Sequence, residues 1–168
     1  MRWHPVHVAL GSNLSDPARQ VEMAIAALAT IDGTRLISRS SLWKSRPMGP
    51  QDQPDFINAV AGLLTQAAPQ AFLDALRKLE RRFGRTEPTV RWGPRVIDLD
   101  LLLYGDRQID EPGLTLPHAG LHQRNFVLYP LAEIAADYWV PGHGRVRTLQ
   151  RRATGEGLER LAARGSSD

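Results

Sequence analysis

RWGPRVIDLDLLLYG, residues 91–105, joins an arginine-rich turn to an apolar run in which two aspartates occupy alternate positions. The run predicts a β-strand, and the period of two places one apolar set on a single face: Ile97, Leu99, Leu101 and Leu103. The opposite face carries Val96, Asp98, Asp100, Leu102 and Tyr104. Carboxylates about 7 Å apart repel each other by about 2 kcal/mol at an effective dielectric constant of about 20. The pattern therefore predicts a cation beside the two aspartates.

The aspartate pair admits two interpretations. Each carboxylate could form a surface salt bridge with a nearby arginine, or the pair could bind Mg²⁺, which takes one or two carboxylates together with phosphate oxygens. Gly93 and Pro94 hold a turn directly before the pair, between two arginines, and the other face of the strand is apolar. This setting favours the magnesium site.

Basic residues concentrate just ahead of this strand. Residues 77–95 hold seven arginines and lysines against two glutamates, whereas the whole chain has a formal net charge of only +3. Cations near a helix C-terminus are favoured by the helix dipole, which is one explanation. The other is that Arg85 and Arg95, which bracket a loop, stabilise transferring phosphate groups with their forked donors. Beside a magnesium pair we favour the second.

Composition bounds the remaining possibilities. The 168 residues are 42% hydrophobic, which predicts a single domain over residues 1–168 with a substantial core. The chain has no cysteine, which excludes disulfides and thiolate zinc sites. No stretch approaches the roughly 20 apolar residues of a membrane span, and the N-terminus lacks a signal-peptide pattern, so we expect a cytoplasmic protein without membrane contact. The P-loop pattern and the H-E-x-x-H zinc motif are also absent.

The order of predicted elements indicates the fold class. Strands are expected at residues 6–10, 35–44, 56–65 and 96–104, with helices beginning at Pro17 and Pro69. This is the β-α-β-β-α-β order of a ferredoxin-like α+β fold with a mainly antiparallel sheet. Appended elements follow: a short strand near Ile109, a third helix from about Leu121 that Pro130 kinks or breaks, and a weakly patterned C-terminal tail from about residue 145.

Four stretches in this order resemble the 6-hydroxymethyl-7,8-dihydropterin pyrophosphokinase family: GPQDQPDFINAV (49–60), LERRFGR (79–85), RWGPRVIDLDLLLYG (91–105) and LTLPHAGLHQRNFVLYPL (114–131). The resemblance implies a monomeric enzyme of folate biosynthesis that transfers pyrophosphate from ATP to the pterin hydroxymethyl group and releases AMP. It also implies a cofactor of two Mg²⁺ ions, bound with ATP.

The resemblance assigns roles to individual positions. Asp98 and Asp100 are implied as metal ligands, with Arg85 and Arg95 as catalytic partners on the phosphates. The implied ATP site comprises Glu80, Arg85, Arg95, Leu101, His118 and Arg124. The implied pterin site comprises Ser45, Met48, Phe56, Asn58, Trp92 and Phe126. Phe56 stands where the family often has tyrosine, and Ala119 also replaces a frequent tyrosine.

Two rival functions use some of the same features. Another magnesium-dependent D-x-D transferase would use the aspartates with a different acceptor, but paired aromatic residues with Asn58 suit a flat heterocycle better than a sugar. An RNA-binding module on a ferredoxin-like sheet would need several exposed aromatic residues on adjacent strands. The sequence has no such aromatic motif, so we expect no nucleic-acid partner.

Overall fold

The computed structural model describes residues 2–47, 52–84 and 96–162, and the structure below is that of these residues. A sheet with strand order β10-β3-β4-β1-β5 runs through the molecule, and β2 pairs with another part of β4. All its pairings are antiparallel. The strands are β1 (His4–Ser12), β2 (Thr34–Arg39), β3 (Trp43–Ser45), β4 (Phe56–Thr65), β5 (Asp98–Tyr104) and β10 (Leu158–Arg160).

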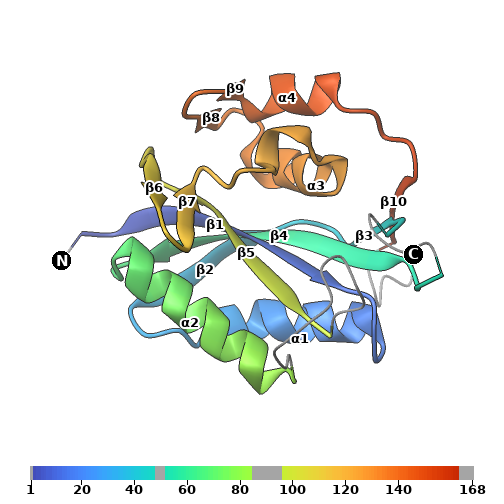
Figure 1. Cartoon of the computed structure of the whole chain (residues 1–168), viewed down its shortest axis with the longest axis horizontal. Helices are drawn as coiled ribbons and strands as arrows, with labels where there is room; N and C mark the ends of the chain where they lie inside the picture. Colours follow the sequence, from blue (N-terminus) through green and yellow to red (C-terminus); the bar gives the residue numbers. More distant parts are fainter. Residues whose placement is uncertain (1, 48–51, 85–95, 163–168) are drawn as a thin grey trace.

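Helices cover both faces of this sheet (Figure 1). One layer is α1 (Pro17–Leu28) with α2 (Pro69–Arg82), and the other is α3 (Asn125–Ala135) with α4 (Val146–Arg152). Smaller elements connect these: β6 (Ile109–Glu111), β7 (Leu114–Leu116), the 3₁₀ turn η1 (Leu121–Gln123), β8 (Trp139–Val140) and β9 (Gly144–Arg145). The predicted ferredoxin-like α+β fold is confirmed, because β1, α1, β2/β3, β4, α2 and β5 follow the expected order.

The first two helices form where the apolar spacing predicts. Each begins with proline at its first position, where the missing N–H has no intrahelical partner to lose. Their buried stripes repeat every three to four residues: Val21, Ala24, Ile25 and Leu28 in α1, and Phe72, Leu76 and Leu79 in α2. These stripes pack on the sheet face that carries Val8, Leu10 and Leu99.

The alternation along β5 fails at its end. Val8 of β1 pairs with Leu101, but His7 pairs with Leu103, so Leu102 is an extra residue in the strand. Such a bulge reverses the faces of the residues that follow it. Leu103 consequently packs in the core beneath α3, while Tyr104 joins the core of α1 and α2, both opposite to the prediction. Asp98 and Asp100 precede the bulge and keep the predicted face.

Two further expectations need correction. Up to residue 162, the C-terminal segment is not a weakly patterned tail, since residues 146–152 form α4 and β10 pairs with β3 at the sheet edge. Val146 and Leu149 are three residues apart and are both buried, a short stripe that one helical turn provides. The third helix begins at Asn125 and not at about Leu121, where the 3₁₀ turn η1 lies, and it is not broken at the buried Pro130 but continues to Ala135. No helix in the described ranges is long and apolar enough to cross a membrane.

Candidate active site

The strand register places the charged and polar candidates in two neighbouring rows of the sheet. Asp98 of β5 pairs with Gly11 of β1, and Gly11 pairs with Asn58 of β4. Asp100 pairs with Ala9 in the neighbouring row, which also contains Val60. Ala9 and Val60 pack in the core beneath α3, so this row marks the sheet face away from α1 and α2. The two aspartates and Asn58 therefore share the face that the sequence predicts.

The two aspartates are an electrostatically unfavourable pair. The pKa of Asp100 rises to about 7, because burial disfavours its charged form and the neighbouring charge of Asp98 adds to that effect. Glu80 raises it further, whereas the positive charges of Arg77 and Arg124 act in the opposite direction. The arginines thus offset only part of the cost of holding this carboxylate ionised.

A hard divalent cation fits this donor pair. Carboxylate oxygens are the ligands that Mg²⁺ prefers, and a cation between them removes their repulsion. Within residues 2–47, 52–84 and 96–162, no cluster of three or more aspartate, glutamate or histidine side chains is placed to hold a metal. A cation at Asp98 and Asp100 needs further ligands, and water or the phosphate oxygens of a substrate provide them.

The outer edge of β5 is held by α2. Glu80 is 2% exposed, and its carboxylate accepts hydrogen bonds from the Leu99 backbone N–H (2.8 Å) and from Arg77 Nη1 (2.8 Å). Arg77 Nη1 also donates to the Leu99 carbonyl at 2.9 Å. The two side chains satisfy the backbone groups of a strand whose pairing in the described ranges is with β1 alone. Glu80 and Arg77 therefore fix the strand segment between the two aspartates.

Leu101 lies in the core rather than on a surface. Its side chain is 4% exposed and packs with the α1 and α2 layer. Contact between this residue and a nucleotide is accordingly limited to its backbone.

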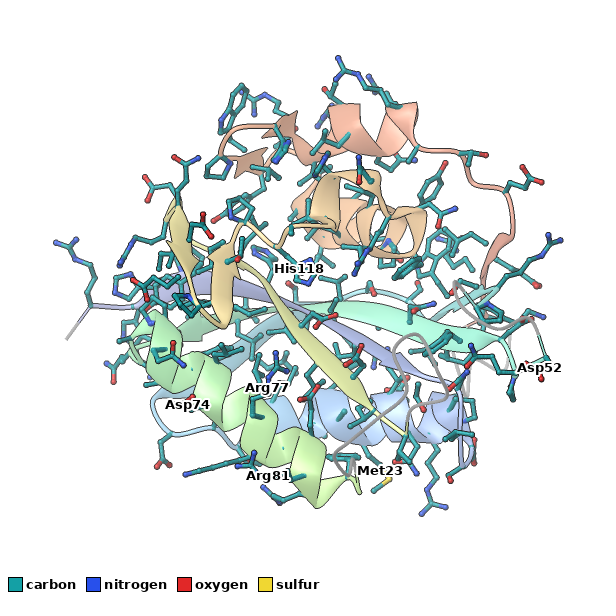
Figure 2. The ribbon with its side chains drawn as sticks, in the orientation of Figure 1. Met23, Asp52, Asp74, Arg77, Arg81 and His118 are labelled. Atoms are coloured by element: carbon teal, nitrogen blue, oxygen red, sulfur yellow. The ribbon has the colours of Figure 1, made fainter. Side chains whose placement is uncertain are left out.

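His118 and Arg124 approach the aspartates from the connection between β7 and α3. The His118 backbone N–H donates to the Leu102 carbonyl at 2.9 Å, which ties this turn to β5. Burial lowers the pKa of His118, and the charges of Arg124 and Arg77 lower it further while Asp98 opposes them. Figure 2 shows His118 and Arg77 on either side of β5. The imidazole is therefore a neutral hydrogen-bonding group near two arginines.

The opposite end of the row is neutral and internally bonded. Asn58 is 5% exposed, and its Nδ2 donates to Ser45 Oγ (2.7 Å) and to the Trp43 carbonyl (3.3 Å). A Cβ atom at Gly11 would lie 3.4 Å from Asn58 Oδ1 and 3.8 Å from the Phe56 ring. The bare Gly11 backbone thus leaves room beside the amide and the aromatic ring.

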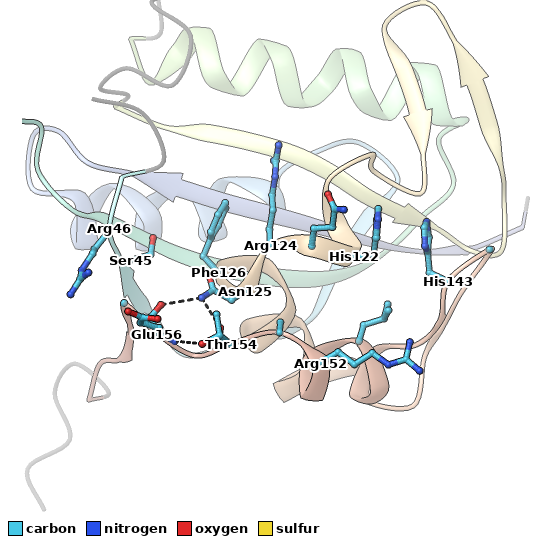
Figure 3. A pocket seen from close by; sticks show the side chains of 15 residues that line it. Ser45, Arg46, His122, Arg124, Asn125, Phe126, His143, Arg152, Thr154 and Glu156 are labelled. Carbon is cyan, nitrogen blue, oxygen red and sulfur yellow. Dashed lines mark hydrogen bonds between the residues drawn. The ribbon is translucent and has the colours of Figure 1, made fainter. Parts of the chain in front are cut away.

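A pocket of about 870 Å³ brings further predicted residues together (Figure 3). Ser45, Arg124 and Phe126 all line it. In Figure 3, Arg124 and Phe126 both extend from the start of α3 toward the sheet. Phe56, Asn58, His118 and the aspartates do not line this pocket. Met48, Arg85, Trp92 and Arg95 lie outside the described residues.

Sequence reasoning missed two residues of this region. Gly11 lies inside β1 between Asn58 and Asp98, whereas the predicted strand ends at residue 10. Arg77 lies in the basic stretch 77–95, where its charge is the only feature that the sequence marks. The available signal for a closer role of Arg77 was its position three residues before Glu80 on one helix, a spacing at which two side chains can pair.

Comparison with known proteins points to a single family. The sequence profile of 7,8-dihydro-6-hydroxymethylpterin-pyrophosphokinase (HPPK) matches residues 7–136. The 2-amino-4-hydroxy-6-hydroxymethyldihydropteridine pyrophosphokinase of Pseudomonas aeruginosa is 46% identical over 156 residues, covering 93% of this chain and 96% of that protein. The Haemophilus influenzae protein of the same name is 47% identical over 135 residues, covering 80% of this chain and 84% of that protein.

Solved structures confirm the fold. A crystal structure of an HPPK-DHPS in complex with substrates has a TM-score of 0.76 at 11% identity and covers 97% of this chain. This chain spans 48% of that protein, about half its length. The likeness at this identity concerns the fold alone.

Proposed function

The chain belongs to the 7,8-dihydro-6-hydroxymethylpterin-pyrophosphokinase family, and on that premise we propose how its own residues divide the work of the reaction. The protein is a pyrophosphokinase that transfers pyrophosphate from ATP to hydroxymethyldihydropterin in folate synthesis. The observation that supports the proposed division is the row Asp98–Gly11–Asn58, which spans three adjacent strands. One end of the row is anionic and the other is a neutral amide.

Asp98 and Asp100 hold the magnesium of MgATP in this proposal, and two ions are bound. Magnesium there supplies charge neutralisation for the triphosphate. The support is electrostatic: Asp98 and burial together raise the pKa of Asp100 to about 7, a cost that a nearby cation relieves. Glu80 and Arg77 act behind the strand and keep the two aspartates at a fixed spacing.

His118, Arg124, Arg85 and Arg95 bind the phosphates. Arginine presents forked donors that match phosphate oxygens, and a neutral imidazole adds an N–H donor. The other implied nucleotide contacts are Glu80 and Leu101, and the burial of both side chains favours an indirect role for Glu80 and a backbone contact for Leu101.

The pterin binds at the neutral end. Phe56 and Phe126 stack on the two ring faces, and Asn58 hydrogen-bonds the polar edge of the ring. Ser45 holds the Asn58 amide through the 2.7 Å bond, which fixes its orientation before substrate arrives. Met48 and Trp92, which lie outside the described residues, are the other two pterin contacts in this proposal.

The chemistry needs no covalent enzyme intermediate. The pterin hydroxymethyl oxygen attacks the β-phosphorus of ATP, the bond between that phosphorus and the α,β-bridging oxygen breaks, and AMP leaves. The hydroxyl proton passes to solvent. Because no side chain enters a covalent bond, the enzyme accelerates the transfer by aligning two substrates and by neutralising the developing charge.

One assay tests donor, acceptor and bond together. We expect the purified protein to form AMP from ATP and Mg²⁺ only when 6-hydroxymethyl-7,8-dihydropterin is present. AMP formed with a different acceptor and not with the pterin would support another D-x-D transferase. We further propose that the protein acts as a monomeric single domain in the cytoplasm, which light scattering at assay concentration and cell fractionation test.

A further inference from the structure

The short strand β3 holds the amide of Asn58 in place. The Trp43 carbonyl and Ser45 Oγ accept the hydrogen bonds from Asn58 Nδ2, at 3.3 Å and 2.7 Å. The strand has only three residues, and it lies between β4 and the equally short β10. Elements with few ladder hydrogen bonds open locally at low cost in free energy. The orientation of Asn58 therefore depends on contacts that hold β3 from outside the sheet.

Glu133 of α3 makes such contacts. Its carboxylate accepts hydrogen bonds from Trp43 Nε1 at 2.5 Å, from Ser41 Oγ at 2.8 Å and from the Ser41 backbone N–H at 3.2 Å. Hydrogen bonds to an ionised acceptor are about twice as strong as those between neutral groups. One turn earlier on the same helix, the Tyr129 ring meets the Trp43 ring edge-on, with the ring centroids 5.8 Å apart. The start of β3 is thus attached to α3 by a carboxylate and by a ring contact.

The same helix carries part of the proposed pterin site. Phe126 lies near the start of α3, and Glu133 follows two turns later, so both project from one side of the helix. Glu133 is exposed, a setting in which glutamate ordinarily interacts with water. Here its carboxylate is instead directed at the strand that orients Asn58. This one residue therefore joins the helix of the stacking ring to the strand that holds the amide.

We propose that Glu133 is a positioning residue for the pterin end of the site. It holds Ser41 and Trp43 at the start of β3, and through the Trp43 carbonyl it maintains the orientation of the Asn58 amide. The proposal rests on the proposed function, since it takes Asn58 as the group that hydrogen-bonds the pterin edge. It extends that function to a residue that touches neither substrate.

The kinetic constants of two Glu133 variants test this role. We expect Glu133→Ala to raise KM for the pterin about three- to tenfold and to leave kcat and KM for ATP within about twofold, because only pterin recognition is disturbed. Glu133→Gln keeps an oxygen that can accept from Trp43 Nε1 and an N–H that can donate to Ser41 Oγ, so it should restore the pterin KM to within about twofold. The matched control for the lost charge is Glu111→Ala, an exposed glutamate on β6, which should change none of these constants. An unchanged pterin KM in Glu133→Ala, or an equal rise in both KM values, overturns the proposal.

A double-mutant cycle separates this role from a general loss of stability. In an Asn58→Ala background there is no amide to orient, so adding Glu133→Ala should raise the pterin KM by less than about twofold. An equal rise in both backgrounds overturns the proposal. If Glu133→Ala does not fold, Trp43→Phe decides, because it removes the indole donor and keeps an aromatic ring beside Tyr129. A rise of about threefold or more in the pterin KM of Trp43→Phe supports the proposal, and no rise overturns it.

Failure of the proposed function gives a different result. If the unaltered protein forms no AMP with the pterin, the pyrophosphokinase assignment fails, and the NMR signals of the Asn58 side-chain amide then decide the role of Glu133 without any substrate. This amide is nearly buried and hydrogen-bonded, so its protons exchange slowly with solvent. We expect exchange about tenfold faster or more in Glu133→Ala, with the slow rate restored in Glu133→Gln. Equal exchange rates in Glu133→Ala and the unaltered protein overturn the proposal.

Discussion

The two ends of the Asp98–Gly11–Asn58 row are built on opposite principles. At one end, Asn58 is 5% exposed and donates to Ser45 and to the Trp43 carbonyl, so its orientation is set within the protein. At the other, the charge of Asp98 and burial raise the pKa of Asp100 to about 7. The amide end is complete before a ligand binds, whereas the carboxylate end becomes favourable only with a cation.

The difference follows from what each end has to bind. A flat heterocycle is recognised by fixed hydrogen-bonding groups, and an amide locked by its neighbours presents them without reorganisation. The metal ions that accompany a triphosphate carry positive charge, so with them bound the site can hold carboxylates that repel each other in their absence. Functional sites commonly carry such local cost, which the rest of the fold supports. Here the support comes from Glu80 and Arg77 on α2.

Removal of either aspartate should produce the largest change. We expect Asp98→Ala and Asp100→Ala each to reduce AMP formation about 1,000-fold or more at saturating Mg²⁺, the scale of losing a principal electrostatic group. Both variants should remain folded, because each removes one of two carboxylates that repel each other in the absence of a cation. The control is Asp110→Asn, an exposed carboxylate on β6. Turnover like that of the unaltered protein in either alanine variant contradicts the metal assignment.

The pH dependence of stability sharpens the comparison. A carboxyl whose folded pKa is about 7 instead of 3.8 binds its proton more tightly when folded. The stability that its protonated form contributes is therefore lost as pH rises from about 4 to 7. The loss in the free energy of unfolding has an upper bound on the order of 4 kcal/mol, at 1.36 kcal/mol per pKa unit. Without divalent metal, Asp100→Asn should thus be more stable than the unaltered protein at pH 8 and equal to it at pH 4.

The comparison with Asp100→Asn is needed because the titration of His7 changes protein stability with pH in the direction opposite to that of Asp100. Burial lowers the pKa of His7 from 6.5 to about 4, so its folded form binds protons less tightly and stability rises with pH across that range. The two groups offset each other between about pH 4 and 6.5, and the unaltered protein alone would show a shallow profile. Urea unfolding of both proteins at several pH values isolates Asp100. Parallel profiles would show that its carboxyl titrates normally.

Substitution of Glu80 tests whether this residue supports the aspartate strand or contacts the nucleotide directly. Glu80→Ala leaves the Leu99 N–H and the Arg77 guanidinium without the carboxylate that holds them. We expect a loss of about 2–3 kcal/mol in the free energy of unfolding, since a nearly buried acceptor is removed while its partly exposed partner can turn to water. Affinity for ATP should fall only modestly. Unchanged stability with strongly weakened ATP binding would instead make Glu80 a direct nucleotide ligand, as the family resemblance implies.

The sequence predicts most of the fold and the chemistry, and its failures have specific causes. Apolar spacing locates α1 and α2, because each helix buries one face, and the apolar run of residues 56–65 locates β4, which is buried along nearly its whole length. The faces of Leu103 and Tyr104 were wrong because a bulge depends on how β1 pairs with β5, which local periodicity does not encode. The order in residues 145–162 was underestimated in part because β10 becomes a strand only through its pairing with β3.

The residues of the site also divide into those that the sequence reveals and those that only the fold reveals. The aspartate pair was visible because charge in an apolar strand is a local anomaly, and its face follows from the period of two. The roles of Gly11 and of the Arg77 bond to the Leu99 carbonyl were not visible, since each depends on a residue distant in sequence. Functional residues that lie on a single strand can be predicted from the sequence. Contacts between two elements that hold those residues in place can be identified only from the folded structure.

Asn58 provides the smallest expected effect and the most direct test of a preorganised amide end. Asn58→Ala removes the proposed contact with the pterin and leaves Ser45 Oγ without the donor at 2.7 Å. We expect KM for the pterin to rise about 10- to 50-fold, equivalent to about 1.4–2.3 kcal/mol, with little change in kcat or in KM for ATP. Ser45→Ala keeps the Asn58 side chain but frees its orientation, so its effect on the same KM should be smaller, about three- to tenfold. If Ser45→Ala has no effect on pterin KM while Asn58→Ala has the full effect, the amide needs no internal partner. The two ends of the row would then differ only in charge, and not in whether their side chains are held in place before the ligand binds.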